Sequence, residues 1–429
     1  MLAILIILTL LIFFLTGIPV AFALGIVSTI YIFITKEVSM ISIAQRMINS
    51  LDSFPLMAIP FFVLAGRLMN SSGATNKIFE FANNLVGHLK GGLGYVNVLA
   101  SMLFAGMSGS AVADASGLGA VEMEAMINNG YDKNFSAAIT GASAIIGPII
   151  PPSIPMVIYG SVVSVSVGRL FLGGIIPGVL LGLAFMIRIF LISKKRNFPC
   201  GEKQKLKKIL KSFISSAPAL FLPIIILGGI VSGIFTPTEA AAIAVIYSIF
   251  LAIFVYKCFD FKQFQLDLIE SAKTVVILLL IISCAAVFGL VLTRLQIPQK
   301  ITSSLLSISE NPLITILLID ALLLFVGTII EGTAALIILG PMLSVITQEL
   351  GLDPVFVGII VVLNLMIGLV TPPVGMVIFV LSRISGISVN DFMKEEWGFL
   401  LMMIIVVLII SFFPGIVTFI PNFLMGPIS

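Results

Sequence analysis

The chain has 429 residues, of which 59% are hydrophobic and 10% are charged, and its formal net charge is +3. Soluble globular proteins carry about 25% charged residues, and apolar runs of helix length recur along this chain, so the composition excludes a soluble fold and predicts an all-α polytopic membrane protein. Three cysteines without motif spacing and a single histidine disfavour a disulfide framework, a metal centre built from these residues and a Ser–His hydrolase.

The first half of the sequence alternates apolar segments with stretches rich in Gly, Pro and polar residues. A polar loop is expected from Ser71 to Gly92, and two helical pieces flank Gly106–Ser110. A polar link at Asn128–Asn134 precedes a long apolar segment. The helices predicted from the apolar runs lie, in chain order, at about 2–16, 18–35, 39–50 (amphipathic), 54–70, 135–168 and 170–192.

The second half repeats this order. Two helical pieces flank Gly327–Thr333, and a second long apolar segment follows them. The predicted helices lie at about 214–232, 237–256, 274–294, 355–383 and 398–420. The recurrence predicts two repeats in one chain.

Each half carries a Pro–Pro pair inside an apolar stretch, Pro151–Pro152 in the first and Pro372–Pro373 in the second. A Gly stands four residues before each pair, at Gly147 and Gly368. Proline inside a membrane helix removes a backbone donor and clashes with the preceding turn, and freed carbonyl groups are tolerated at membrane depth only inside protein or along a cavity. The matched pairs therefore predict two broken helices, with an ion or substrate site between the halves.

The pieces around 106–110 and 327–333 are rich in Gly, Ser and Thr at their centres. Polarity at the centre of an apolar segment favours a re-entrant hairpin, whose tip stops inside the membrane, over two spanning helices with a tight turn. We therefore predict two inverted repeats, each with about five transmembrane helices, one re-entrant hairpin and one broken helix.

The distribution of Lys and Arg residues predicts the orientation of the chain in the membrane. If the link between the repeats is cytoplasmic, most of the 23 Lys and Arg residues fall on the cytoplasmic side, as the positive-inside rule requires, and both termini are periplasmic. The basic run Lys194–Lys211 is then a topology anchor and not a lipid- or nucleic-acid-binding patch. The predicted domains are a first repeat at 1–193 (scaffold helices 1–70, hairpin and broken helix 93–168), a basic cytoplasmic linker at 194–212, and a second repeat at 213–429 (scaffold helices 213–294, hairpin and broken helix 311–383).

Broken helices end in unpaired carbonyl groups, which suit Na⁺, and half-helix N-termini offer amide donors, which suit a carboxylate. The alternative is that the prolines only kink helices and the hydroxyl groups only hold helices together. The predicted ligands of a first sodium site are Ser108, Gly147, Ile150 and Pro152. The predicted ligands of a second sodium site are Gly327, Thr328, Gly368, Thr371 and Val374.

Acidic residues inside apolar segments are costly and are therefore functional candidates. Asp114 and Glu331 lie close to the predicted hairpin tips, where they could serve ion, proton or gating roles. Together with Ser110 and Thr333, they form the predicted substrate-binding set. No metal other than Na⁺ and no cofactor is expected.

Other charged residues receive structural expectations. Glu239 is predicted to cap a helix that starts after Thr236, since a carboxylate is favoured there by the helix dipole. Asp320 is left open between a contact with another subunit and a buried pair. Four arginines lie near the ends of predicted helices, and most of them are expected to extend toward the membrane interface. They are Arg67, Arg169, Arg294 and Arg383.

No G-x-x-x-x-G-K-[ST] motif occurs, which disfavours transport driven by ATP hydrolysis in this chain.

Five stretches resemble the large membrane subunit of tripartite ATP-independent periplasmic (TRAP) transporters, and the resemblance runs from about Gly17 to the C-terminus. The stretches are Gly91–Val98, Phe104–Asp114, Ile150–Ser153, Gly233–Ala241 and Thr371–Gly375. The resemblance implies a secondary transporter of the bacterial inner membrane, in which a domain of hairpins and broken helices moves against a scaffold by an elevator mechanism. It also implies sodium sites around the two broken helices, which are the positions named above.

The resemblance further implies partners and substrates. We expect a small TRAP membrane subunit as a separate chain, a periplasmic substrate-binding protein, the lipid bilayer, and an organic acid such as sialic acid or a C4-dicarboxylate, taken up with Na⁺ as the coupling ion. The alternatives are a self-sufficient Na⁺ or H⁺ symporter of similar architecture and, more distantly, a channel or a structural membrane scaffold. An enzyme is not expected, since no compact acid–base or metal-ligand set is present.

Overall fold

The computed structural model describes residues 2–196, 198–297, 299–301, 303 and 311–427. These residues form helices joined by turns, and none of them belongs to a strand. Within this described part, eight helices are long and apolar enough to cross a membrane. The predicted all-α polytopic membrane fold is confirmed.

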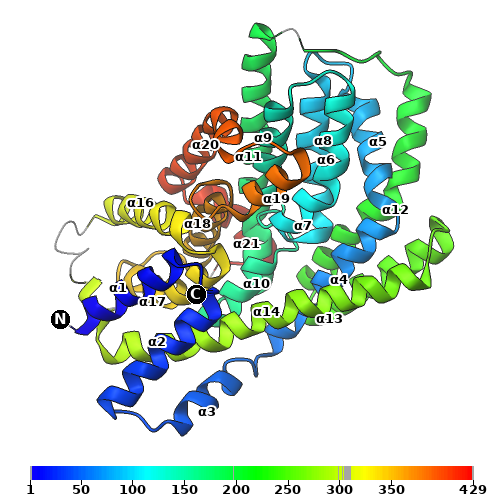
Figure 1. Cartoon of the computed structure of the whole chain (residues 1–429). Helices are drawn as coiled ribbons and strands as arrows, with labels where there is room; N and C mark the ends of the chain where they lie inside the picture. Colours follow the sequence, from blue (N-terminus) through cyan, green and yellow to red (C-terminus); the bar gives the residue numbers. More distant parts are fainter. Residues whose placement is uncertain (1, 197, 298, 302, 304–310, 428–429) are drawn as a thin grey trace.

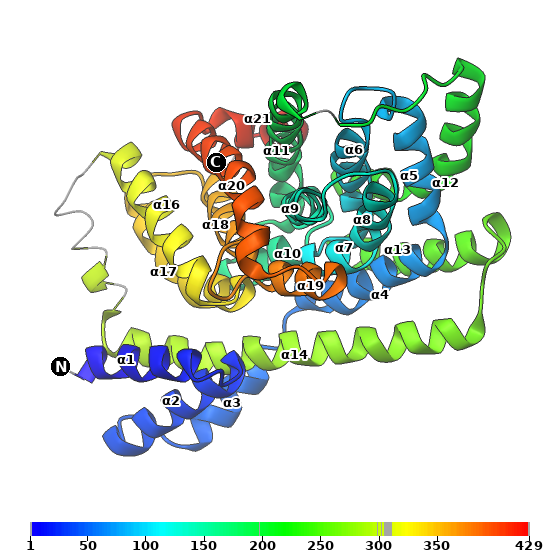
Figure 2. The same cartoon turned by 45° about the horizontal axis from the view of Figure 1, so that its top comes forward.

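One long helix, α14 (Phe261–Arg294), crosses the molecule and separates the N-terminal helices from the rest (Figures 1 and 2). Its 34 residues span about 51 Å at 1.5 Å per residue. On one side it packs against α2 (Val20–Thr35) and the amphipathic α3 (Ile41–Asn49), with α1 (Leu2–Leu15) lying on α2. On the other side it packs against α4 (Ala58–Ser71).

The start of α14 corrects the prediction, which placed a helix only from about 274. Asp260 caps the helix through a bond from the Lys262 amide to its carboxylate, 3.0 Å long. The first turns contain Asp267, Glu270 and Lys273, so their hydropathy is low although they are helical.

The first half continues from α4 into helices that surround its predicted hairpin and broken helix. A helix replaces most of the polar loop predicted from Ser71 to Gly92, because Ala74, Ile78 and Ala82 recur every four residues and are fully buried on one helix face. The elements are η1 (Phe54–Met57, before α4), α5 (Ala74–Val86), α6 (Gly92–Ser108), α7 (Ala111–Ser116), α8 (Leu118–Asn128), α9 (Lys133–Ala144), α10 (Ile154–Val163) and α11 (Val167–Lys195).

The second half follows the same plan, with two differences from the prediction. Its first helix begins at Leu206, inside the predicted linker, and the last predicted helix is two helices that are separated at Pro414. The elements are α12 (Leu206–Val231), α13 (Pro237–Phe250) with η2 (Leu251–Val255), α14, α16 (Pro312–Ile329), α17 (Gly332–Glu349), α18 (Pro354–Ile367), η3 (Gly368–Val370), α19 (Met376–Ser385), α20 (Val389–Phe412) and α21 (Gly415–Met425).

Corresponding helices of the two halves keep a constant spacing. The ends of α6 and α16, at Ser108 and Ile329, are 221 positions apart, and so are the starts of α9 and α18, at Lys133 and Pro354. The first prolines of the two Pro–Pro pairs, 151 and 372, have the same separation. Inversion of one repeat relative to the other, the membrane orientation and the domain limits stay predictions.

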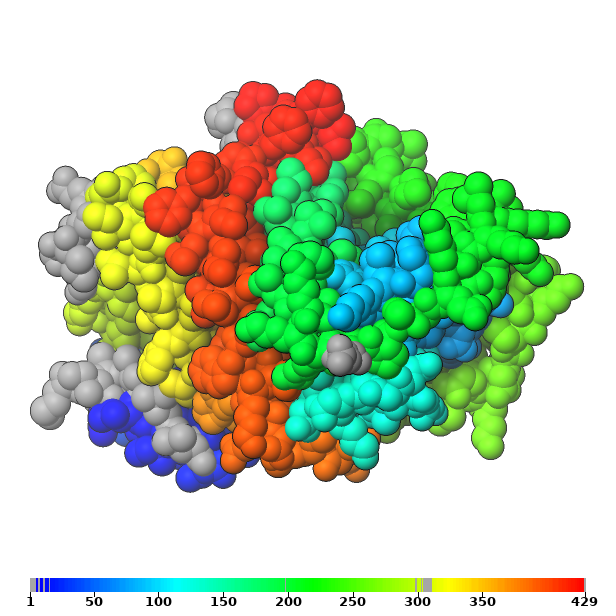
Figure 3. Space-filling model, turned by 90° about the horizontal axis from the view of Figure 1, so that it is seen from above, coloured from blue at the N-terminus to red at the C-terminus, as the bar shows by residue number. Residues whose placement is uncertain are grey.

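The halves are packed into each other. Helix α10 of the first half lies against α17, and both α9 and α11 lie against α20. Seen from above, the orange and red C-terminal segments lie between the yellow segments and the green and cyan segments of the first half (Figure 3). This interlocking brings the two broken helices to the centre of the molecule.

Candidate functional site

Both Pro–Pro stretches interrupt a helix, as predicted. In the first half α9 ends at Ala144 and α10 begins at Ile154, while in the second half α18 and the short η3 end at Val370 and α19 begins at Met376. The Pro151–Pro152 and Pro372–Pro373 peptide bonds are cis. Each interruption leaves a short non-helical segment, which is buried in the first half and partly exposed in the second.

The tip of each hairpin is hydrogen-bonded to the break of the same half. The amide of Ile154 donates to the carbonyl of Gly109, 3.3 Å away, and the amide of Val374 donates to the carbonyl of Thr328, 3.2 Å away. The matched bonds join α6–α7 to the first break and α16–α17 to the second. Hairpin and broken helix thus form one unit in each half.

Glycines make these approaches possible. Gly109 has φ +64°, and a Cβ there would lie 2.6 Å from the carbonyl oxygen of Pro152, closer than side chains pack. At Gly368 a Cβ would overlap the backbone of Gly327, and at Gly147 it would overlap the carboxylate of Asp114. The two glycines noted in the sequence therefore stand where the hairpin touches the break.

In each half, a buried hydrogen bond joins the hairpin to the broken helix one helical turn before Gly147 or Gly368. Ser143 Oγ donates to Asn97 Oδ1 of α6 at 2.6 Å, and Asn364 Nδ2 donates to Asp320 Oδ1 of α16 at 2.7 Å. Asp320 Oδ2 also accepts a 2.7 Å bond from Ser411 of α20. These contacts decide what the sequence left open, because Asp320 is paired inside the chain.

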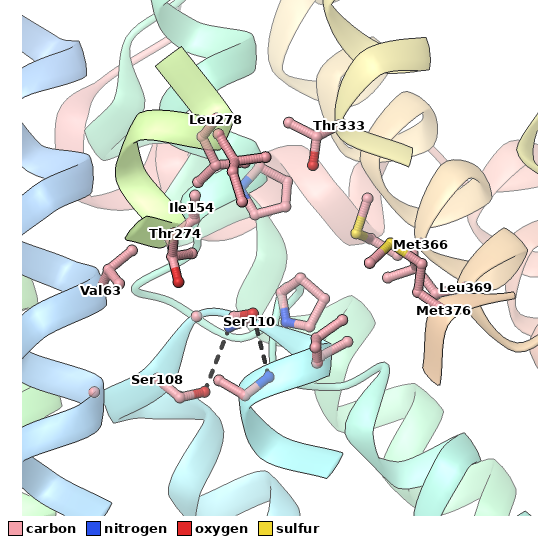
Figure 4. A pocket seen from close by; sticks show the side chains of 18 of the residues that line it. Val63, Ser108, Ser110, Ile154, Thr274, Leu278, Thr333, Met366, Leu369 and Met376 are labelled. Atoms are coloured by element: carbon pink, nitrogen blue, oxygen red, sulfur yellow. Dashed lines mark hydrogen bonds between the residues drawn. The ribbon is translucent and has the colours of Figure 1, made fainter. Parts of the chain in front are cut away.

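The tips and breaks of both halves line one cavity of about 330 Å³, a size typical of small-ligand pockets. Figure 4 shows Ser108 and Ser110 of the first tip facing Thr333 across this space, with Met366 and Leu369 on a third side. Helices α4 and α14 close the remaining wall, where Val63 and Thr274 lie. The predicted convergence of four elements is thus present.

The similarity to known proteins fits this arrangement. A family model described as "Tripartite ATP-independent periplasmic transporter, DctM component" matches residues 7–416. The chain belongs to this family. The resemblance found in the sequence motifs is confirmed.

Named relatives of this DctM-family chain are bacterial permeases. The "Sialic acid TRAP transporter large permease protein SiaM" of Vibrio cholerae serotype O1 is 43% identical over 410 residues, which cover 96% of each chain. The "C4-dicarboxylate TRAP transporter large permease protein DctM" of Pseudomonas aeruginosa is 38% identical over 402 residues, covering 94% of each chain.

Two solved transporters share the fold. The YdaH transporter of Alcanivorax borkumensis has a TM-score of 0.60 at 14% identity and covers 86% of each chain. MtrF of Neisseria gonorrhoeae has a TM-score of 0.57 at 12% identity, with 87% of this chain and 85% of that one covered. At such identities the likeness concerns the fold alone.

Of the predicted site residues in this DctM-family chain, four line the cavity: Ser108, Ser110, Glu331 and Thr333. Ser110 Oγ accepts from the amide of Ala113, and the Glu331 carboxylate accepts from the amides of Thr333 and Ala334 at 3.0 and 2.9 Å. The two residues therefore cap α7 and α17. The other predicted residues lie outside the cavity lining, in the breaks and at their contacts with the tips: Asp114, Gly147, Ile150, Pro152, Gly327, Thr328, Gly368, Thr371 and Val374.

Asp114 is the predicted residue with the most unusual surroundings. It is 2% exposed, and neither carboxylate oxygen accepts a hydrogen bond of good geometry, although the Ser108 hydroxyl lies near the carboxylate. It lies against Gly147 of the first break. Burying an uncompensated charge costs several kcal/mol, so this carboxylate suits a cation or a proton at the break.

The backbone of the first break also suits a hard cation. Hydrogen bonds inside the segment are accepted by the carbonyls of Ile146 and Pro148 and by none of the three predicted carbonyl ligands: Gly147, Ile150 and Pro152. Carbonyl and carboxylate oxygens are the ligand types that such cations take. The residues present therefore fit the predicted sodium site, whose occupancy stays a prediction.

Several residues with functional potential were not found by sequence reasoning. Arg67, expected at the interface, lines the cavity, as does Thr274. Glu122 and Glu396 are 1% and 0% exposed, and their carboxylates lack partners. In the sequence all of them stand near polar stretches, so nothing local distinguishes them from surface residues. The capping role predicted for Glu239 is confirmed by its reciprocal bonds with Thr236.

A second cavity, of about 550 Å³, follows the first along α14. Residues 274–281 of α14 contribute to the first cavity and residues 282–293 to the second, and α10 and α17 also contribute to both. At its edge, Ser53 and Ser161 share a 2.7 Å hydrogen bond between η1's N-cap and α10. The two spaces are thus arranged in series along three helices.

Proposed function

We propose that the chain is the permease subunit of a Na⁺-coupled uptake system for an organic acid, in the bacterial inner membrane. The observation that carries this proposal is the convergence of both hairpin tips and both helix breaks on one cavity. The first turns of α7, α10 and α17 line this cavity through Ala111, Ile154 and Thr333, and the positive end of a helix dipole favours an anion. The uncapped carbonyls and the buried Asp114 carboxylate favour a cation beside it.

The substrate class follows from the relatives and the cavity together. The relatives are named for sialic acid, C4-dicarboxylates, isethionate and 2,3-diketo-L-gulonate, which are all small organic anions. A cavity of about 330 Å³ is adequate for such a molecule. We propose sialic acid as the first substrate to test and a C4-dicarboxylate as the second.

The cavities in series support alternating access. If the hairpins and broken helices moved as one body along α14, the substrate site would pass from the first cavity to the second. The Ser53–Ser161 bond would then break and re-form with each cycle. We propose such an elevator movement, supported in this family by a small membrane subunit and supplied by a periplasmic binding protein.

The test is transport by the whole system in liposomes. The chain is reconstituted with the small subunit, and binding protein and labelled sialic acid are added outside. Accumulation that requires an inward Na⁺ gradient and saturates with substrate is expected. Uptake that is indifferent to the Na⁺ gradient would refute the coupling, uptake without binding protein would favour a self-sufficient symporter, and non-saturating flux would indicate a channel.

A further inference from the structure

The cavity of about 330 Å³ is lined by a charged side chain that has no role in the proposed function. Among the described residues that line it, two are charged, Arg67 and Glu331. The Glu331 carboxylate is engaged by two backbone amides at the start of α17. Among these described lining residues, the guanidinium of Arg67 is therefore the one cation available to a molecule in the cavity.

The residue before Arg67, Gly66, explains why Arg67 lies at the cavity. Helix α4 crosses the end of α6 at Gly66, where a Cβ would lie 3.1 Å from Ser108 Cα, tighter than most side-chain contacts. The absence of a side chain allows the two helices to approach. The next residue, Arg67, consequently lies beside the first hairpin tip and lines the cavity.

The donors of Arg67 are largely unused. A guanidinium carries five N–H groups, and the hydrogen bond of Arg67 in the structure is one of 3.5 Å to Thr274 Oγ1. No ion pair within 4.0 Å among the described residues includes it. The nearby Glu270 carboxylate pairs with Lys273 at 2.7 Å and interacts with Arg67 only at longer range. By contrast, Arg169 donates to two backbone carbonyls at the C-terminal end of the chain, at 2.8 and 3.1 Å.

We propose that Arg67 binds the carboxylate of the transported acid, an inference that rests on the proposed function. A planar guanidinium matches a carboxylate through two parallel hydrogen bonds. Most of the surrounding lining is apolar, including Val63, Ile277 and Leu278, and low polarity strengthens an ionic contact. Thr274 Oγ1 already donates to the Glu270 carbonyl at 2.9 Å, so the Arg67 fork can turn to the substrate without leaving that hydroxyl unpaired.

The competing interpretation is structural. Arg67 follows the contact with the end of α6, where the carbonyls of Met107 and Ser108 lie close to Gly66, and a cation there would stabilise the helix end. In that case a substitution would weaken the fold without changing which molecule binds. The two interpretations differ in whether Arg67 distinguishes an acid from its neutral ester.

The experiment measures binding of sialic acid and of its methyl ester to the large and small subunits in nanodiscs, in NaCl, by calorimetry. The unmodified protein is expected to bind the acid at least about tenfold more tightly than the ester, as a charge-assisted pair implies. Arg67→Gln should remove most of this preference, and Arg67→Lys should keep part of it. Arg196→Gln, which removes an arginine from an exposed ion pair with Glu395, is the matched control and should keep the full preference.

The outcomes separate the two proposals. If Arg67→Gln keeps the full preference for the acid over the ester, the role of Arg67 is overturned. It is also overturned if the unmodified protein transports the acid but shows no preference for the acid over the ester. Failure of the unmodified system to transport any acid under a Na⁺ gradient overturns the proposed function itself. If Arg67→Gln does not elute as a folded complex, the Arg67→Lys variant and the ester comparison still decide.

Discussion

The two broken helices have the same backbone plan but different surroundings. The first break is almost entirely buried, and Asp114 adds an unpartnered carboxylate to its free carbonyls. The second break is partly exposed from Thr371 to Val374, and the carbonyls of Gly368 and Thr371 already accept amide hydrogen bonds, at 3.1 and 3.2 Å. Position 335, which is 221 residues after Asp114, is an alanine. The two breaks thus share the path of the chain but differ in their chemistry.

We expect the largest difference between the two breaks when the glycine that contacts the hairpin, Gly368 or Gly147, is substituted. Gly368→Ala should abolish transport and lower the yield of folded protein, because its Cβ would overlap the backbone of Gly327, which cannot move away. Gly147→Ala should be milder, since the overlapping group is the Asp114 side chain, which can rotate. Uptake and size-exclusion profiles of the two variants check this order. Equal losses in both would show that the two breaks are equally constrained.

The next effect concerns the charge at the first break. Asp114→Asn keeps the shape of the side chain and removes its charge, so the Na⁺ concentration for half-maximal uptake should rise about tenfold or more if a cation contacts this carboxylate. Glu331→Gln is the control from the second half, because its oxygen can still accept a bond at the start of α17. Unchanged Na⁺ dependence in Asp114→Asn would assign the residue to a role other than ion binding.

A smaller effect is expected at the polar bonds that hold each hairpin to its broken helix. Asp320→Ala removes the buried carboxylate that accepts from Asn364 and Ser411, which keep their bonds to the Ile360 and Val407 carbonyls. Each lost hydrogen bond to a charged acceptor costs about 1.5–3 kcal/mol. Ser143→Ala removes the donor to Asn97 Oδ1 and the acceptor of Ser101, which are neutral hydrogen bonds worth about 0.5–1.5 kcal/mol each, while Asn97 Nδ2 stays bonded to Thr140 at 2.8 Å. Thermal unfolding in detergent should therefore show a greater loss for Asp320→Ala. A greater loss for Ser143→Ala would contradict this comparison.

The smallest effects should come from the hydroxyl groups at the two sites. Ser108→Ala and Thr371→Ala should each raise the Na⁺ requirement by a few-fold, roughly the loss of one neutral ligand of about 1 kcal/mol. Thr371 Oγ1 already donates to the Ile367 carbonyl at 2.9 Å, which leaves its lone pairs free for an ion. Titration of uptake against Na⁺ measures both. If neither titration changes, the ions are held by backbone carbonyls and carboxylates alone.

Much of the fold was accessible from sequence because it depends on local signals. Apolar runs located the spanning helices, and the paired Pro–Pro stretches located both breaks. The search for apolar runs missed helices that are polar on one face, as in α5 and the first turns of α14. Hydropathy reports how apolar a segment is and not whether it is helical. It also failed at Pro414, where one apolar run contains two helices.

The sequence by itself determined the class of protein, the two breaks, the hairpin tips and the acidic residues near them, because each depends on composition or on neighbours along the chain. Only the tertiary structure decided which of these groups share a cavity, that Asp320 is paired with Asn364 and Ser411, and that Arg67 lies at the hairpin tip. Those facts depend on contacts between segments far apart in the chain. A close helix crossing such as that of Gly66 on Ser108 is set by the packing of whole helices, which no local pattern encodes.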